Sequence, residues 1–194
     1  MQGTRTDRWR RIIQIALPFV VMAVCILFDQ LTKNYFKNNY SLGEDRTIIP
    51  GFFYFTYTIN PGAAWSFLAG VSWAQLFFKI LTGVSLVLFG FLMYYAFKNN
   101  YRWLSFAVAF ILGGTIGNFI DRLLFNGVTD FLGFTFGNYN FPIFNLADSF
   151  LVVGVIMAVI HFFFLDENKI FDSKTKQTKV ESQDADKEVS SKDE

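Results

Sequence analysis

Four long apolar segments divide the chain, and shorter polar stretches separate them. They cover residues 12–28, 74–97, 103–124 and 145–165. Each segment is about long enough to cross a ~30 Å hydrocarbon layer at a rise of ~1.5 Å per residue. The pattern therefore predicts four membrane-spanning helices.

A different pattern occupies the connection between the first two segments, residues 34–73. From Phe53 to Ile59, large apolar side chains alternate with smaller or more polar ones, which is the period of a β-strand. Asn60-Pro61-Gly62 then reads as a turn. With a second outer loop over residues 126–144, the predicted fold class is a membrane all-α protein with a small β element. It has four transmembrane helices plus an extracytoplasmic β-cradle.

The charges orient the predicted helices. Residues 1–11 contain four arginines and one aspartate, and residues 98–102 form a short basic loop. Because cationic loops stay in the cytoplasm, both termini are expected there. We therefore expect a basic cytoplasmic N-terminus over residues 1–11, a membrane domain over residues 12–165, and a disordered cytoplasmic tail over residues 166–194.

Composition narrows the possible chemistry. The chain has 194 residues, 53% of them hydrophobic, and a formal net charge of +1, which favours no nucleic-acid partner. The lone Cys25 excludes an internal disulfide and a cysteine-based metal cluster. The lone His161, near the end of the last apolar segment, favours neither a metal site nor a catalytic triad. We expect no cofactor.

Polar residues gather between positions 113 and 148, at the edges of segments otherwise suited to lipid. Ionisable groups in such places are costly and mark a functional site by default. Asn118, Asp121 and Arg122 have the i, i+3, i+4 spacing of one helix face. The residues also have structural interpretations: Gly113 and Gly117 can serve helix packing alone, and Asp121 and Arg122 can form an ion pair at the helix end.

Two further polar pairs allow structural interpretations. Asn145 and Asp148 resemble a helix N-cap and its N3 carboxylate. Asp29 and Lys33, spaced i, i+4 at the outer end of the first helix, can form an interfacial pair worth a few tenths of a kcal/mol.

Asp130 can be a turn residue in a loop, although its neighbours Val128 and Phe131 favour a fixed and partly buried position. It shares the outer region with Asp148, where few other charges occur. We hypothesise that Asp130 and Asp148 form a catalytic carboxylate pair at the outer membrane surface.

Five motifs, in order along the chain, resemble those of bacterial lipoprotein signal peptidase, or signal peptidase II. They are Asp29-Gln30-Leu31-Thr32-Lys33, Asn60-Pro61-Gly62-Ala63-Ala64-Trp65-Ser66, Gly113-Gly114 with Asn118-Phe119-Ile120-Asp121-Arg122, Val128-Thr129-Asp130-Phe131 and Phe144-Asn145-Leu146-Ala147-Asp148. Each motif alone is weak, but five in order relative to four predicted spans are specific. The resemblance covers roughly residues 12–165.

The resemblance implies a membrane aspartyl endopeptidase of the bacterial cytoplasmic (inner) membrane, multi-pass, with its active site on the outer face. It implies substrates that are diacylglyceryl-modified prolipoproteins, cut just before the lipidated cysteine. The catalytic residues map onto Asp130 and Asp148. The residues expected to bind substrate or support the pair are Asp29, Lys33, Asn60, Gly62, Asn118, Asp121, Arg122 and Asn145. Prolipoproteins and membrane lipids are the expected partners of a monomer.

Two other functions fit parts of the pattern. A small ion- or proton-coupled transporter would use Asp121, Arg122 and Asp148 as a relay, and it predicts polar groups throughout the bilayer depth. A non-catalytic membrane assembly factor would use the glycines and aromatic loops to hold a partner, and it would tolerate Asp→Asn changes. The gathering of polar residues at one face favours the peptidase.

Overall fold

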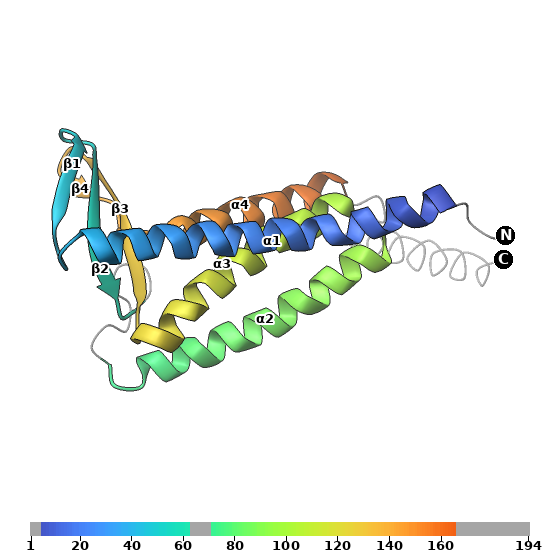
Figure 1. The fold of residues 1–194 in the computed structure, drawn as a ribbon, viewed down its shortest axis with the longest axis horizontal. Coiled ribbons are helices and arrows are strands. Elements are labelled where there is room, and N and C mark those ends of the chain that lie inside the picture. Colours follow the sequence, from blue (N-terminus) through green and yellow to red (C-terminus); the bar gives the residue numbers. More distant parts are fainter. Residues whose placement is uncertain (1–4, 63–70, 166–194) are drawn as a thin grey trace, which may run out of the picture. The chain divides into compact units, whose positions relative to one another are not determined.

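The structure, a computed structural model, describes residues 5–62 and 71–165. Its helices are α1 (Arg5–Asn39), α2 (Ala74–Lys98), α3 (Arg102–Phe125) and α4 (Leu146–Ile160), which continues as a π-helical turn over His161–Leu165 (Figure 1). Its strands are β1 (Asp45–Ile49), β2 (Phe53–Asn60), β3 (Val128–Phe136) and β4 (Tyr139–Asn140). The expected tail, residues 166–194, and residues 63–66 of the second motif lie outside the described residues.

Four of the described helices are long and apolar enough to cross a membrane, as predicted. The chain divides into two compact units after Ala158. The first contains the sheet, α1 to α3 and most of α4. The second begins with the last two residues of α4 and the π-helical turn.

Helix α3 is the central helix of the first unit. In its most apolar stretch 61% of the residues are buried, against 11–17% in the other three spans. Glycines allow this close packing: an added Cβ at Gly113 would lie 2.7 Å from Cys25 Cβ in α1, and one at Gly154 would lie 2.7 Å from the Ala107 carbonyl oxygen in α3. The packing interpretation is thus confirmed for Gly113, whereas Gly117 makes room for the side chain of Asp29.

The four strands form one antiparallel arrangement in the order β1-β2-β3-β4. Strand β2 confirms the strand predicted over residues 53–59, and its Thr58 pairs with Asp130 of β3. Strands β1 and β3 were not predicted. In β3, residues 128–131 are all buried, so the segment lacks the alternation of polar and apolar residues that marks a half-buried strand.

The first helix extends further than the sequence indicated. Residues 34–39, expected in the outer loop, continue α1 to Asn39. Phe36 explains this extension, because its ring stacks on Phe131 of β3 at 4.3 Å and contacts Phe55 of β2 at 5.2 Å between centroids. The last turns of α1 therefore pack against β2 and β3. Figure 1 shows this end of α1 beside the strands.

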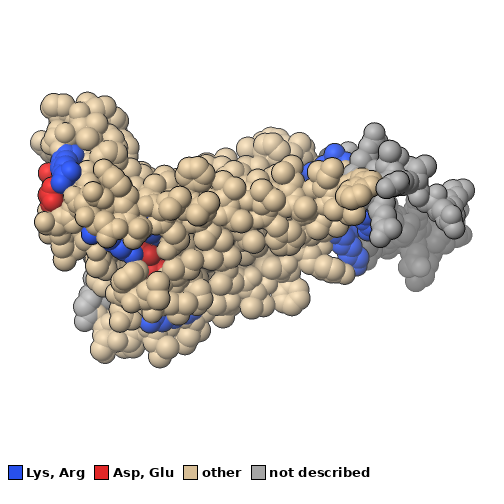
Figure 2. All heavy atoms as spheres, viewed as in Figure 1, with Lys and Arg blue, Asp and Glu red and all other residues tan. Residues whose placement is uncertain are grey.

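Charged side chains occur near the ends of the helices. On the face shown in Figure 2, blue and red atoms lie towards the two ends of the first unit, and the middle of the helices shows neither. This distribution is the one that a hydrocarbon layer requires, because charge at its centre is costly. The described spans are also free of charged residues in the middle of their sequences, which argues against the transporter, because it would need polar groups along the depth of the spans.

Candidate active site

Asp130 is a buried carboxylate within the pairing of β2 and β3, and it is only 3% exposed. Asn145 Nδ2 donates to its Oδ1 at 2.8 Å, and Asn60 Nδ2 donates to its Oδ2 at 3.2 Å. The Gly62 N–H donates to Asn60 Oδ1 at 2.9 Å, which turns the amide group of Asn60 towards Asp130. The expected buried position is confirmed, and the alternative of a turn residue is wrong because Asp130 lies within β3.

Asp148 lies in the first turn of α4 and forms a capping box with Asn145. The Asp148 N–H donates to Asn145 Oδ1 at 3.0 Å, and the Asn145 N–H donates to Asp148 Oδ2 at 3.1 Å. The predicted N-cap is therefore confirmed. The other carboxylate oxygen, Oδ1, accepts a hydrogen bond from Asn118 Nδ2 at 2.8 Å.

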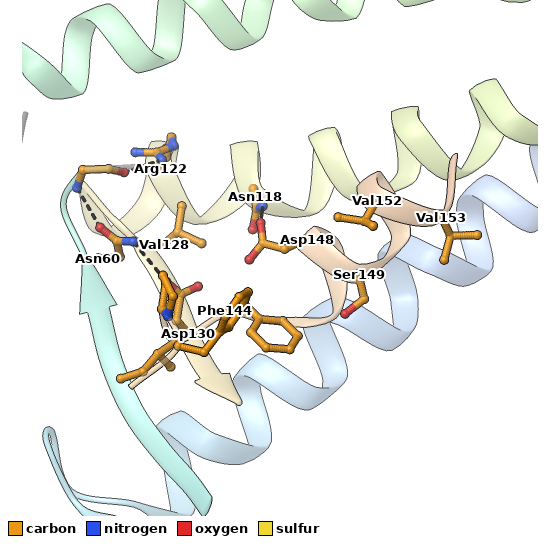
Figure 3. A pocket seen from close by; sticks show the side chains of 14 residues that line it. Asn60, Asn118, Arg122, Val128, Asp130, Phe144, Asp148, Ser149, Val152 and Val153 are labelled. Atoms are coloured by element: carbon orange, nitrogen blue, oxygen red, sulfur yellow. Dashed lines mark hydrogen bonds between the residues drawn. The ribbon is translucent and has the colours of Figure 1, made fainter. Parts of the chain in front are cut away.

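Asn145 connects the two carboxylates. Its side-chain nitrogen donates to Asp130, while its backbone N–H and its side-chain oxygen hold Asp148. Both aspartates line one cavity, and Figure 3 shows their side chains lying near each other within it. The fold thus brings together the two carboxylates that the sequence analysis singled out.

The pKa of Asp130 is raised to about 7, first by burial and then by the negative charge of Asp148. The hydrogen bonds from Asn60 and Asn145 and the positive charge of Lys33 oppose this rise in pKa. Since two neighbouring carboxylates do not both ionise cheaply, the pair holds a proton close to neutral pH.

Lys33 is a buried cation, 1% exposed, that connects several of the candidate residues. Its Nζ lies 2.9 Å from Asp29 Oδ2 and donates to Asn118 Oδ1 at 2.9 Å. Because Lys33 holds the oxygen of the Asn118 amide, the amide nitrogen is directed to Asp148. The expected ion pair of Asp29 and Lys33 is confirmed, but it is buried and not interfacial: α3 covers both side chains, and Gly117 leaves the space for Asp29.

Asp121 ties α3 to the strand that carries Asp130. Its Oδ2 accepts a hydrogen bond from the Thr129 N–H at 2.8 Å, and its Oδ1 lies 3.5 Å from Lys37 Nζ. Lys33 Nζ lies 3.8 Å from the same carboxylate. The buried Lys33 and the partly exposed Lys37 are the partners of Asp121, so the ion pair considered for Asp121 and Arg122 is not the contact that the structure shows.

Arg122 instead lines the cavity. Its Nη2 donates to the Gly62 carbonyl oxygen at 2.8 Å, and its guanidinium lies 4.5 Å from the centre of the Phe78 ring. Its Nη1 is buried and has no hydrogen-bond partner within the described part of the chain.

The cavity has a volume of about 690 Å³ and two different kinds of wall. Polar residues of the site, among them Asp130 and Asp148, line one part (Figure 3). Apolar residues 141–144 and the α4 residues Val152 and Val153 line the other, and Val152 is 59% exposed. A cavity that joins carboxylates to an exposed apolar helix face can hold a peptide that also carries an apolar segment.

Sequence reasoning missed several residues of this network. Gln30 Nε2 donates to Asp29 Oδ2 at 3.0 Å and to the Gly117 carbonyl oxygen at 3.1 Å. Lys37 follows Lys33 by one helical turn, and this i, i+4 spacing was a signal that could have identified it. Thr129 acts through its backbone N–H and carbonyl oxygen, for which the side chain gives no signal.

Comparison with known proteins extends these observations. A family model for signal peptidase II matches residues 21–164. The chain is 45% identical over 159 residues to the lipoprotein signal peptidase of Bacillus pumilus (81% of this chain, 98% of that protein). It is 42% identical over 161 residues to that of Listeria welshimeri (83% and 98%). A solved bacterial membrane enzyme superposes with a TM-score of 0.68 at 33% identity, covering 80% of this chain and 93% of the other.

Proposed function

The chain belongs to the signal peptidase II family, a family of membrane peptidases, and from this premise we propose how its residues remove signal peptides from lipoproteins. Asp130 and Asp148 act as an aspartic dyad that activates water. The observation that supports this role is the bridge through Asn145, which holds both carboxylates in one cavity.

In the proposed reaction one carboxylate accepts a proton and the other carboxyl group donates one. Asp148 lies at the N-terminus of α4, where the partial positive charge of the helix favours a charged carboxylate. Asp130, with its pKa raised to about 7, holds the proton. In the proposed step, Asp148 accepts a proton from water as the water oxygen attacks the scissile carbonyl carbon. Asp130 donates its proton to the developing oxyanion.

The tetrahedral intermediate then collapses. The carbon–nitrogen bond breaks, the proton taken up by Asp148 passes to the leaving amine, and Asp130 recovers its proton from the hydroxyl group of the intermediate. The pair returns to its starting protonation, so no other acid or base is needed. Arg122, whose side chain lines the cavity, binds a neighbouring carbonyl oxygen of the substrate backbone.

The other candidate residues position this pair. Asn60, Asn118 and Asn145 direct their amide nitrogens at the carboxylates. Lys33, with Asp29 and Asp121, fixes Asn118 and the start of β3. Gly62 supports the site with its backbone, since its N–H orients Asn60 and its carbonyl oxygen accepts from Arg122.

The apolar wall of the cavity suits the substrate class of the family. We infer that a prolipoprotein bearing diacylglycerol on its cysteine enters sideways from the membrane. Its signal helix and acyl chains lie against Val152, Val153 and residues 141–144, and the bond before the lipidated cysteine reaches the dyad. This arrangement needs a single copy of the chain.

The membrane orientation follows from the charges. We propose that the enzyme lies in the cytoplasmic membrane with both termini inside, because the basic loop at residues 98–102 favours the cytoplasm. The sheet and the dyad then lie on the outer face.

The experiment that tests this function uses purified protein and a synthetic prolipoprotein peptide. One peptide carries diacylglycerol on the cysteine, and its twin is unlipidated. We expect mass spectrometry to show one cut, just before the lipidated cysteine, and no cut in the twin. Equal cleavage of both peptides, or a cut elsewhere, would contradict the proposed specificity.

A further inference from the structure

A second cavity is lined by residues towards one end of α1, α2 and α3. Figure 1 shows that these helix ends are remote from the sheet. Its volume is about 320 Å³, within the range of small-molecule sites. Its polar lining residues include Arg11 of α1, Tyr94 and Lys98 of α2, Asn100 of the following loop, and Tyr101 and Arg102 at the start of α3.

Each of the three cations of this cavity lies at the end of a predicted membrane span. Arg11 directly precedes the apolar run that begins at Ile12, Lys98 is the last residue of α2, and Arg102 is the first of α3. A residue at the end of a span lies where hydrocarbon gives way to lipid headgroups. The cavity therefore lies at headgroup level, whichever face of the membrane it occupies.

The charge of the cavity is not compensated by the protein part that the structure describes. The described lining contains no Asp or Glu. No described carboxylate forms an ion pair with Arg11, Lys98 or Arg102, whereas Lys33, Lys37 and Arg46 all have such partners. Three cations around one hollow thus favour an anion.

The start of α3 also favours an anion, and the remaining walls of the cavity are apolar. Helix α3 begins here, and Tyr101 at its N-cap makes no side-chain hydrogen bond to the first turn, so the positive end of the helix dipole adds to the cations. Ile15 and Phe97 supply apolar walls. Tyr94 is 65% exposed, as is usual for aromatic residues at headgroup level.

We propose that this cavity binds the headgroup of an anionic phospholipid. Arg11, Lys98 and Arg102 contact the phosphate, and the acyl chains continue along the apolar surfaces of the spans. A soluble phosphate would use the same cations but would not use the apolar walls or the location at the membrane boundary. The site is separate from the cavity of Asp130 and Asp148, so the proposal does not depend on the catalytic one.

The test measures lipid binding to the full-length protein in neutral detergent by native mass spectrometry. Phosphatidylglycerol, phosphatidylcholine and inorganic phosphate are titrated separately. We expect saturable binding of phosphatidylglycerol at least about tenfold tighter than that of phosphatidylcholine, since each Lys or Arg near a lipid surface contributes measurably to anionic lipid binding. Inorganic phosphate alone should bind at least about tenfold more weakly than phosphatidylglycerol.

The variant Arg11→Gln/Lys98→Gln/Arg102→Gln should bind phosphatidylglycerol no better than phosphatidylcholine. The matched controls are Arg46→Gln at the sheet end, and Arg11→Lys/Lys98→Arg/Arg102→Lys, which keeps the charges. Both should keep the wild-type preference. If the triple variant does not fold, each single Gln variant should lose affinity several-fold.

Three results would overturn the proposal. They are equal binding of the two lipids by the wild type, an unchanged preference in the Gln variants, and binding of inorganic phosphate as tight as that of the lipid. The last result would identify a site for soluble anions. Cleavage of the lipidated peptide reports separately on the dyad, since these three cations do not line its cavity.

Discussion

Asp130 receives two amide donors that cannot turn away, because the oxygens of Asn60 and Asn145 are held by the N–H groups of Gly62 and Asp148. The carboxylate is therefore fixed in place before any substrate binds. Burial nevertheless makes its charge costly, and its pKa rises to about 7. A rigid carboxyl group whose pKa lies close to the working pH is what a general acid requires.

The raised pKa predicts the pH dependence of cleavage. A raised pKa means that Asp130 stays protonated until the pH approaches about 7 and loses its proton above that value. We expect kcat/KM to fall as the pH rises through about 7, because the acid of the dyad is lost; the apparent pKa belongs to the pair. A rate profile of the purified enzyme measures this. A rate that stays constant to pH ~9 would contradict the assignment.

Lys33 supplies a second prediction at this scale, because it is the buried counter-ion of two carboxylates. Lys33→Met leaves Asp29 and Asp121 charged in a dry environment, and we expect a loss of about 3–5 kcal/mol in the free energy of unfolding. The control Lys79→Met removes an exposed lysine bonded to Asn126 and should cost less than about 1 kcal/mol. Denaturation in detergent measures both, and equal losses would refute the buried role of Lys33.

The sequence identified most of these residues through their spacing and through the cost of charge near a bilayer. It did not indicate their partners. Asp121 was considered as the partner of Arg122, its neighbour in the sequence, yet it contacts Lys33 and Lys37 on another helix and the backbone of β3. Contacts of this kind depend on how the helices pack, which spacing within one helix does not specify.

At the scale of elements, glycines determine how closely α4 approaches α3, and this approach positions Asp148. Gly114 faces the first turns of α4, where an added Cβ would lie 2.8 Å from Leu151 Cγ and 3.1 Å from Leu151 N, and would also meet the Ala147 carbonyl oxygen. Because backbone atoms cannot yield as a side chain does, α4 would have to move.

Gly114→Ala should therefore destabilise the protein by about 1–3 kcal/mol and should reduce cleavage, since α4 carries Asp148. The control is Gly90→Ala in α2, where a Cβ would meet nothing within 4 Å. Alanine is the better helix former, so the control should be neutral or slightly stabilising. Thermal unfolding and cleavage assays measure both variants, and similar behaviour of the two would contradict this packing.

The apolar pattern was sufficient to predict the helices, because a span of about 20 apolar residues has few alternatives. It was not sufficient for the ends of α1 or for β3. The extension of α1 to Asn39 depends on Phe36 packing against β2 and β3. Strand β3 is buried where it carries Asp130, so the alternation that revealed β2 is absent.

At the scale of the molecule, the sheet and the proposed dyad lie at one end of the spans, and the basic cavity lies at the other. If the dyad meets its lipidated substrate at the outer face of the membrane, the basic cavity at the other end of the spans lies at the inner face. From the charge bias of the short loop at residues 98–102 we expect the basic cavity to lie at the cytoplasmic face.

Cysteine labelling tests this orientation. Cys25 is buried and gives little background, so Ser41→Cys near the sheet and Asn100→Cys at the opposite end can be compared directly. In intact cells, a membrane-impermeant maleimide should label Ser41→Cys only, and in lysed cells it should label both. Labelling of Asn100→Cys alone in intact cells would reverse the proposed topology.

The central claim is that Asp130 and Asp148 together perform the hydrolysis, and single-turnover cleavage of the lipidated peptide by Asp130→Asn and Asp148→Asn tests it most directly. Each change keeps the shape but removes a carboxylate, so each folded variant should lose at least ~10³-fold in rate. The control Asp45→Asn, in the exposed strand β1, should cleave at the wild-type rate. Cleavage within about tenfold of wild type by either dyad variant would contradict the account.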